Sequence, residues 1–293
     1  MSRVLIVMLV AACGLLLALL ATAARPGAAA GVGMSLPGDT AEAAPRHVLA
    51  AAPPMNEPPV NEPPEVVSPA LPACTFEDRP APLSGYDQWQ QTVLDTVFAL
   101  DEQYAPADLV AAADAFPAGS RGGGDFQVRA IMIDDLTALL ADAAANGVEF
   151  AIQSAYRSYT YQLTTFQYWV DLNGLESALA SSARPGHSEH QLGTAIDFRS
   201  ANGPPAWDLA DWAQTPEGGW LAANAWRYGF VMSYPAGSKD LTCYDYEPWH
   251  YRYLGRDLAA EVERLGVTPR ELLWAKATGA ATTLTGPTAQ VRE

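Results

Sequence analysis

Three of the four histidines in this 293-residue chain fall in two short segments that also carry carboxylates. The first segment, residues 185–198, reads PGHSEHQLGTAIDF, and the second, residues 246–253, reads YEPWHYRY. A catalytic zinc ion is typically held by three protein nitrogen or oxygen ligands, with a fourth position open to water. The two segments supply such a set as His190, Asp197 and His250, so their spacing predicts one catalytic zinc ion.

Two further polar residues fit the chemistry of peptide hydrolysis. Glu247 stands three residues before His250 and could take a proton from water and deliver it to the leaving amine, a contribution of about 10²- to 10⁴-fold. Arg157, within the sequence SAYRS, could bind a substrate carboxylate through its guanidinium fork or stabilise an oxyanion. The pattern therefore predicts a metallopeptidase.

The same residue types also allow purely structural roles. A histidine in an aromatic strand, such as His250, is often packed in a core, and Asp197 could cap a turn. Glu247 could be a solvated loop charge, and Arg157 could be a surface ion-pair partner. The chain contains no His-Glu-x-x-His signature, so spacing alone leaves both interpretations open.

Four ordered sequence blocks carry a resemblance that favours the catalytic interpretation. They are SAYRSY (154–159) with Gln162, SEHQLGTAID (188–197), WLAANAWRYGF (220–230) with Tyr234 and Pro235, and EPWH (247–250). These blocks resemble those of the VanY-type D-alanyl-D-alanine carboxypeptidases. A looser similarity extends over residues 83–256.

The resemblance implies a role for each matching residue. It implies that zinc is bound by His190, Asp197 and His250 and that Glu247 is the catalytic base. It also implies that the substrate is contacted by Arg157, Gln162, Ser188 and Trp249. The implied fold is the α+β fold of the Hedgehog and DD-peptidase domains, with zinc in a cleft between helices and a small antiparallel sheet.

Two positions depart from the family pattern. His187 replaces a small or tyrosyl residue, and we expect it near the rim of the site rather than among the zinc ligands. Cys243 stands where relatives commonly have glycine. Only Cys13 and Cys74 accompany it, and because paired cysteines are usual in an oxidising compartment, we expect a Cys74–Cys243 disulfide.

These features lead to ranked hypotheses on function. The first is a zinc D-alanyl-D-alanine carboxypeptidase that removes the terminal D-Ala of peptidoglycan stem peptides. An LD-carboxypeptidase or an endopeptidase acting on the same peptides is the enzymatic alternative, and a non-catalytic wall-binding module is the other class. A serine DD-peptidase is excluded, because the chain has neither a Ser-x-x-Lys nor a Gly-x-Ser-x-Gly motif.

Charge narrows the range of partners. The formal net charge is −16, and the chain has only two lysines, Lys239 and Lys276. Without a basic stripe there is nothing to follow a phosphate backbone, so nucleic acid is not an expected partner. The sequence leaves peptidoglycan stem peptides as the expected partner and implies no protein partner.

Composition along the chain predicts four segments. Residues 1–24 are a signal peptide or membrane anchor, since an apolar run from Val4 to Ala24 follows Arg3. Residues 25–82 are rich in Pro and Ala and read as a disordered linker. Residues 83–278 form the catalytic domain, and residues 279–293 form a polar tail. The protein is thus expected outside the cytoplasm, anchored to the membrane or secreted into the wall.

Hydrophobic periodicity within the domain predicts an α+β arrangement. Helices are expected over residues 86–104, 126–146, 159–181, 221–228, 257–265 and 269–278. Strands are expected over residues 148–155, 194–198, 230–234 and 249–253.

Overall fold

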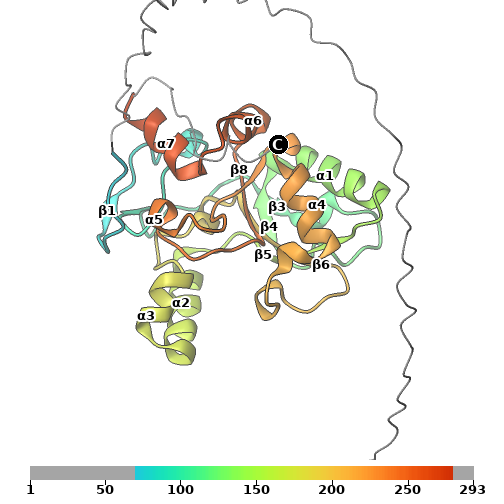
Figure 1. Cartoon of the computed structure of the whole chain (residues 1–293), viewed down its shortest axis with the longest axis horizontal. Helices are drawn as coiled ribbons and strands as arrows, with labels where there is room; N and C mark the ends of the chain where they lie inside the picture. Colours follow the sequence, from blue (N-terminus) through green and yellow to red (C-terminus); the bar gives the residue numbers. More distant parts are fainter. Residues whose placement is uncertain (1–69, 280–293) are drawn as a thin grey trace, which may run out of the picture. The chain divides into compact units, whose positions relative to one another are not determined.

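A four-stranded antiparallel sheet is the central element of the computed structural model, which describes residues 70–279 (Figure 1). Its strands lie in the order β5-β6-β8-β7. They are β5 (Phe150–Ser154), β6 (Ala195–Ser200), β8 (His250–Tyr253) and β7 (Phe230–Met232). All three pairings are antiparallel. The expected small antiparallel sheet and α+β fold are confirmed.

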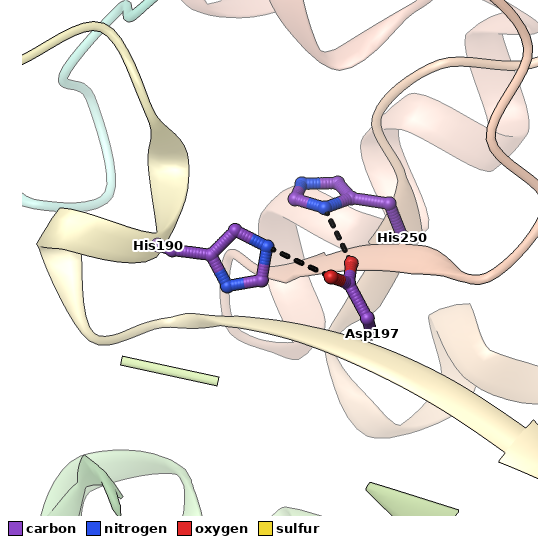
Figure 2. Close-up of side chains that lie close together, drawn as sticks. All are labelled: His190, Asp197 and His250. Carbon is purple, nitrogen blue, oxygen red and sulfur yellow. Dashed lines mark hydrogen bonds and ion pairs between the residues drawn. The ribbon is translucent and has the colours of Figure 1, made fainter. Parts of the chain in front are cut away.

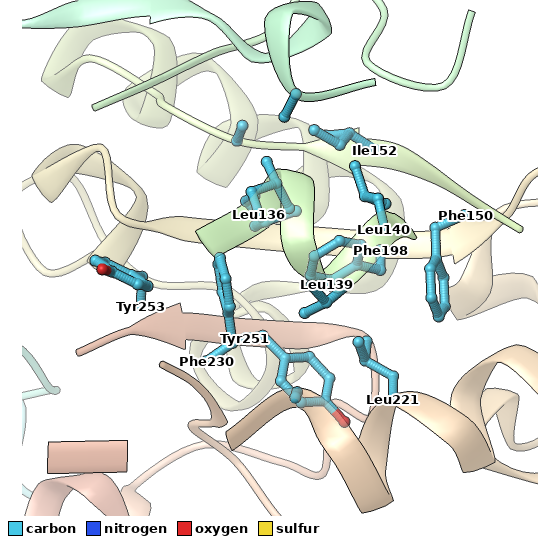
Figure 3. Close-up of a cluster of buried hydrophobic side chains, with 14 of the residues drawn as sticks. Leu136, Leu139, Leu140, Phe150, Ile152, Phe198, Leu221, Phe230, Tyr251 and Tyr253 are labelled. Carbon is cyan, nitrogen blue, oxygen red and sulfur yellow. The ribbon is translucent and has the colours of Figure 1, made fainter. Parts of the chain in front are cut away.

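One face of this sheet is covered by helix α1 (Ile133–Ala145). Successive strand residues point to opposite faces, and alternate residues of the four strands pack with the helix in one apolar cluster (Figure 3). Each fully buried large apolar side chain contributes about 1.5–3 kcal/mol. The cluster includes Leu136, Leu139, Leu140, Phe150, Ile152, Ile196, Phe198, Phe230, Tyr251 and Tyr253.

The intervening strand residues face the other side of the sheet. There β6 contributes Asp197, and β8 contributes His250 and Arg252, all of them buried. A second apolar cluster adjoins these polar side chains and involves α6 (Arg256–Leu265) and α7 (Pro269–Ala277). The sheet therefore separates an apolar core from a buried polar layer.

The remaining elements are short. Strand β1 (Arg79–Pro80) pairs in parallel with β2 (Phe98–Ala99), and β3 (Leu109–Ala111) pairs antiparallel with β4 (Gln127–Arg129). Besides α2 and α3, described next, there are helices α4 (Pro216–Asn224) and α5 (Lys239–Thr242). The 3-10 helices are 86–88, 112–115, 130–132, 189–192, 206–208, 212–214 and 225–228.

The helix expected over residues 159–181 is divided in two. Helix α2 (Tyr159–Asn173) ends at Gly174, whose φ of 83° lies in the left-handed region, and α3 (Leu175–Ser181) follows directly. Glycine adopts this backbone conformation without the steric cost of a Cβ atom. The two helices pack against each other and extend away from the sheet (Figure 1).

The prediction of a helix over residues 86–104 is wrong. After one 3-10 turn the chain forms a tight turn at Asp95, whose Oδ1 accepts hydrogen bonds from the backbone of Val97 and Phe98 at 2.7 and 2.8 Å. The same carboxylate is held by Arg270 at 2.7 Å. A local side-chain hydrogen bond that competes with the helix ladder thus decides the backbone here.

The folded unit begins before the boundary expected at residue 83. Strand β1 and Cys74 lie in the segment assigned to the linker, and Arg270 donates to the carbonyl of Pro72 at 2.9 Å. The structure joins Cys74 to Cys243, with 5.2 Å between their Cα atoms. The predicted signal or anchor, residues 1–24, lies outside the described residues. Among residues 70–279, no helix has both the length and the apolar character needed to cross a membrane.

The backbone at Cys243 leads to a prediction about the disulfide. Its φ of 72° is left-handed, a conformation that costs a residue with a Cβ about 1–2 kcal/mol. Replacing Cys74 and Cys243 with serine should lower the free energy of unfolding by about 2–4 kcal/mol in urea titrations. The Cys74→Ser, Cys243→Gly pair should lose about 1 kcal/mol less.

Cys13→Ser is the matched control and should leave stability unchanged. Thiol titration of unreduced, denatured wild-type protein should detect one free cysteine. Three reactive thiols, or equal stability of all variants, would contradict the assignment.

Candidate active site and metal centre

The site is built first on the pairing of β6 with β8. Asp197 and His250 are directly opposite in the antiparallel register, and opposite residues of such a pair place their Cβ atoms about 4.5–5.5 Å apart on one face. His250 Nδ1 lies 2.9 Å from Asp197 Oδ1. The register of two neighbouring strands thus brings together two residues that are 53 positions apart.

His190 reaches the same point from a 3-10 helix, Glu189–Leu192. Ser188 caps this helix by accepting a hydrogen bond from the backbone of His190, and Gly193 ends it with a φ of 72°. His190 Nδ1 lies 2.6 Å from the carbonyl oxygen of Ala155, so Nδ1 carries the proton and donates it. His190 Nε2 is therefore left with a lone pair that faces Asp197 Oδ2 at 3.2 Å.

These three side chains fit a metal ion. One ligand atom from each of His190, Asp197 and His250 lies within 4.8 Å of the other two, and all three residues are buried (Figure 2). His190 Nε2 is buried and makes no hydrogen bond within the described part of the chain. A lone pair directed at a carboxylate oxygen is repulsive unless a cation lies between them. Two imidazoles and a carboxylate also match the ligand preference of zinc.

The electrostatics of the trio favour positive charge at the same place. Burial lowers the pKa of His190 to about 4, which keeps its imidazole neutral. Burial opposes ionisation of Asp197, but the two histidines lower its pKa well below the usual range. Burial also acts against a charged His250, yet hydrogen bonds to Asp197 and Glu189 raise its pKa to about 10. A proton or a metal ion at His250 Nδ1 is thus strongly favoured.

Glu189 is a functional residue that the sequence analysis missed. Its Oε2 lies 2.9 Å from His250 Nε2 and accepts a 2.6 Å hydrogen bond from Ser233. Such a carboxylate behind a ligating histidine sets its tautomer and orientation. With the Nε2 proton donated to Glu189, Nδ1 is the nitrogen available to a metal. The signal was the position of Glu189 between Ser188 and His190 inside the ligand motif.

Arg252 neutralises this second carboxylate. Its Nη1 donates to Glu189 Oε1 at 2.9 Å, and its Nη2 donates to the carbonyls of Trp89 and Thr92. Burial disfavours the charged form of Glu189, but Arg252 and His250 lower its pKa to about 2. A buried charge without a partner is costly, so Arg252 is what allows Glu189 to remain an acceptor for His250.

Glu247 lies beside the trio without joining it. Its Oε2 is 4.0 Å from His250 Nδ1, and 16% of its side chain is exposed. The loop before β8 holds it through backbone hydrogen bonds, from Glu247 to Tyr234 and from His250 to Glu247. Burial raises the pKa of Glu247 to about 8. A carboxyl group with a pKa near neutrality suits proton transfer.

Arg157, Asp197 and Glu247 line one cleft of about 1280 Å³. Arg157 follows β5, its backbone donates to the carbonyl of His190, and the two carboxylates act on its guanidinium electrostatically. Its Nε is buried and makes no hydrogen bond to any described residue. The guanidinium is therefore available to an anionic group that enters the cleft.

The other expected site residues are placed differently. Trp249 lines the cleft, whereas Gln162 and Ser188 are buried and do not line it. Gln162 donates to the carbonyl of Ala183 at 2.7 Å, and Ser188 caps the helix of His190. His187 is buried, is hydrogen-bonded to Asp95 and Asp78, and does not line the cleft, so it lies away from the rim where the sequence analysis placed it.

Comparison with known proteins supports the same reading. Residues 125–256 match the family model VanY, described as D-alanyl-D-alanine carboxypeptidase. The chain is 36% identical to YodJ of Bacillus subtilis (strain 168) over 59% of its own length and 63% of the relative's. It is 38% identical to a D-alanyl-D-alanine carboxypeptidase of Enterococcus faecium over 40% of its length and 34% of the relative's. It thus spans less than two thirds of either relative.

Solved structures extend the comparison to the fold. The LdcB LD-carboxypeptidase superposes with a TM-score of 0.52 at 32% identity, covering 65% of this chain and 86% of that one. A VanY D,D-pentapeptidase in complex with Zn(II) superposes with a TM-score of 0.52 at 26% identity, covering 63% and 99%. The architecture is that of the Hedgehog/DD-peptidase fold class. Within that class, the chain belongs to the VanY-type D-alanyl-D-alanine carboxypeptidase family.

The contact between Glu189 and His250 yields a prediction on metal affinity. Glu189→Ala removes the acceptor that orients His250, so the zinc dissociation constant should rise by about 10- to 100-fold. Chelator competition on folded protein would measure it. Glu189→Gln retains an acceptor oxygen and should lose less.

Glu149→Gln, at an exposed glutamate, is the control. Circular dichroism is needed alongside, because Arg252 loses its buried partner and stability should fall by about 3–5 kcal/mol. Unchanged zinc affinity in folded Glu189→Ala would remove Glu189 from the metal centre.

Proposed function

We propose that the protein is a zinc-dependent D-alanyl-D-alanine carboxypeptidase that removes the terminal D-Ala from peptidoglycan stem peptides outside the cytoplasmic membrane. The observation that carries the proposal is the shared cleft. Asp197 of the buried metal-ligand trio, the carboxyl group of Glu247 and the guanidinium of Arg157, whose Nε makes no hydrogen bond to a described residue, line one cavity large enough for a peptide. The D-alanyl-D-alanine carboxypeptidases among the relatives support the choice of substrate.

Each side chain has a defined part in this reaction. His190, Asp197 and His250 would hold one zinc ion, which supplies Lewis acidity toward water and the scissile carbonyl. Glu247 accepts a proton from the attacking water and delivers it to the amine of the departing D-Ala. Arg157 binds the C-terminal carboxylate and so restricts cleavage to the last peptide bond.

A second candidate is an LD-carboxypeptidase acting on tetrapeptides. The observation that favours it is the likeness to LdcB, which is 32% identical to this chain, whereas VanY is 26% identical. Both reactions release one C-terminal D-Ala and require the same machinery. They differ in the residue that precedes the bond, which is D-Ala in the pentapeptide and an L-configured centre in the tetrapeptide.

The function predicts the effect of Glu247→Gln. The amide cannot accept the proton, so kcat should fall by about 10²- to 10⁴-fold, while zinc content stays at one ion per chain because Glu247 is not a ligand. Mass spectrometry of tri-, tetra- and pentapeptide digests would follow the products, with Glu149→Gln as control. Loss of one alanine from the pentapeptide alone supports the DD activity, and loss from the tetrapeptide supports the LD activity. No metal-dependent product from any stem peptide would refute both.

Arg157 yields a prediction on substrate recognition. Charge-assisted hydrogen bonds contribute about 1.5–3 kcal/mol, so amidation of the substrate C-terminus should lower kcat/KM by about 10- to 150-fold in the wild type. Arg157→Met should lower kcat/KM for the acid to a similar extent and abolish the difference between acid and amide. Arg121→Met, at an exposed arginine, should behave like the wild type. A variant at Arg157 that still discriminates acid from amide would place carboxylate recognition elsewhere.

A further inference from the structure

The cleft continues beyond the metal centre along helix α2. The residues of α2 that line the cleft are spaced three or four positions apart, so they lie on one face of the helix and form a wall of the cleft. This wall consists of Tyr161, Thr164, Thr165, Tyr168, Trp169, Leu172 and Asn173.

The apolar side chains of this wall do not belong to the core. Gln162 is the one buried residue of α2, while Tyr161, Tyr168 and Leu172 are 63%, 58% and 59% exposed. Exposed apolar surface on this scale, beside a cleft, is typical of a binding site. Packing within the described chain does not account for it.

Aromatic rings connect this wall to the metal centre. Trp249 precedes the ligand His250, and its ring lies 6.4 Å from that of Trp207. Trp207 lies 6.2 Å from Trp169, and Trp169 lies 5.1 Å from Tyr168. The four rings, which we name the aromatic track, form a continuous series from the site of cleavage to the exposed face of α2.

We propose that the outer part of the aromatic track, Trp169 and Tyr168, binds the saccharide end of the substrate, meaning the amino-sugar rings to which the stem peptide is attached. This rests on the proposed function. A pyranose ring has an apolar C–H face and a polar hydroxyl edge. Indole and phenol rings match the face, and the neighbouring hydroxyl and amide groups of Thr164, Thr165 and Asn173 match the edge.

The charge of the cleft favours a neutral occupant. Asp125, Asp208 and Asp245 line it, and Arg157 is its one basic residue within the described chain. A phosphate-bearing wall polymer would meet repulsion along the track. The D-Ala end of the stem peptide offers the rings only methyl side chains, so this end does not account for the aromatic track.

Distance agrees with this assignment. Up to four stem residues precede the scissile bond, and in extended conformation they span at most about 14 Å. A sugar at their N-terminal end would lie about two ring spacings from Trp249, since the Trp249–Trp207 and Trp207–Trp169 rings are 6.4 and 6.2 Å apart. That is the position of Trp169, and Tyr168 is the next ring of the track.

The test compares two substrates with the same stem, the free peptide and the peptide carrying the GlcNAc-MurNAc disaccharide. Wild-type enzyme with zinc should show a kcat/KM higher by about 2- to 12-fold for the disaccharide form, the range expected of a ring contact. Trp169→Ala should remove this advantage and leave the free peptide unaffected. Leu163→Ala is the matched control, since Leu163 is an exposed apolar residue of α2 outside the cleft lining.

Calorimetry on the Glu247→Gln protein separates this proposal from the proposed function. If the wild type hydrolyses neither substrate, the proposed carboxypeptidase function is contradicted. The saccharide-binding role of the aromatic track is then tested by the binding measurements alone. Tighter binding of the disaccharide peptide than of the free peptide, lost in Trp169→Ala, supports the track. Equal kcat/KM for both substrates in the wild type, together with equal binding of both in the Glu247→Gln protein, would overturn it, as would equal losses for both ligands when Trp169→Ala is added.

Discussion

The antiparallel pairing of Asp197 with His250 is the constraint on which the rest of the site depends. It places a carboxylate and an imidazole 2.9 Å apart on the buried polar face of the sheet. A slip of one residue between β6 and β8 would turn one of the two into the apolar cluster. The large apolar residues on the opposite face, Ile196, Phe198 and Tyr251, prevent that slip, because they must stay packed against α1. The core therefore fixes the register, and the register fixes the positions of Asp197 and His250.

Each buried charged side chain of the site requires a partner of opposite charge or a hydrogen bond. The charge of Asp197 is balanced by His250, and that of Glu189 is balanced by His250 and Arg252, whose Nη2 donates to backbone carbonyls. The chain of hydrogen bonds thus runs from Arg252 to the metal trio without an unpaired charge. Arg157 and Glu247 are the exceptions, since Arg157 Nε makes no hydrogen bond to a described residue and burial raises the pKa of Glu247. Both line the cleft, where a substrate and a water molecule can complete their interactions.

The sequence predicted the elements that periodicity controls and missed those that tertiary contacts control. Strands β5, β6, β7 and β8 follow from alternating apolar residues and were anticipated within a few residues. The segment around Asp95 was predicted as a helix, because its bonds to Val97, Phe98 and the distant Arg270 leave no trace in local spacing. Similarly, spacing selected His190, Asp197 and His250, which the structure brings together. The hydrogen bond from Arg252 to Glu189 joins side chains 63 positions apart, so only the three-dimensional structure reveals it.

The two sides of the cleft differ in how firmly the rest of the protein packs against them. The metal side is formed by strands whose apolar faces are fully buried, so its side chains are held rigidly, as catalysis requires. The α2 side belongs to a helical pair that buries little more than Gln162 and Ala178. A wall with so little packing of its own can adjust to a large ligand at low cost. The buried polar residues of the sheet are thus supported separately from the exposed face of α2, so substitutions on α2 can change that face of the cleft without disturbing His190, Asp197 and His250.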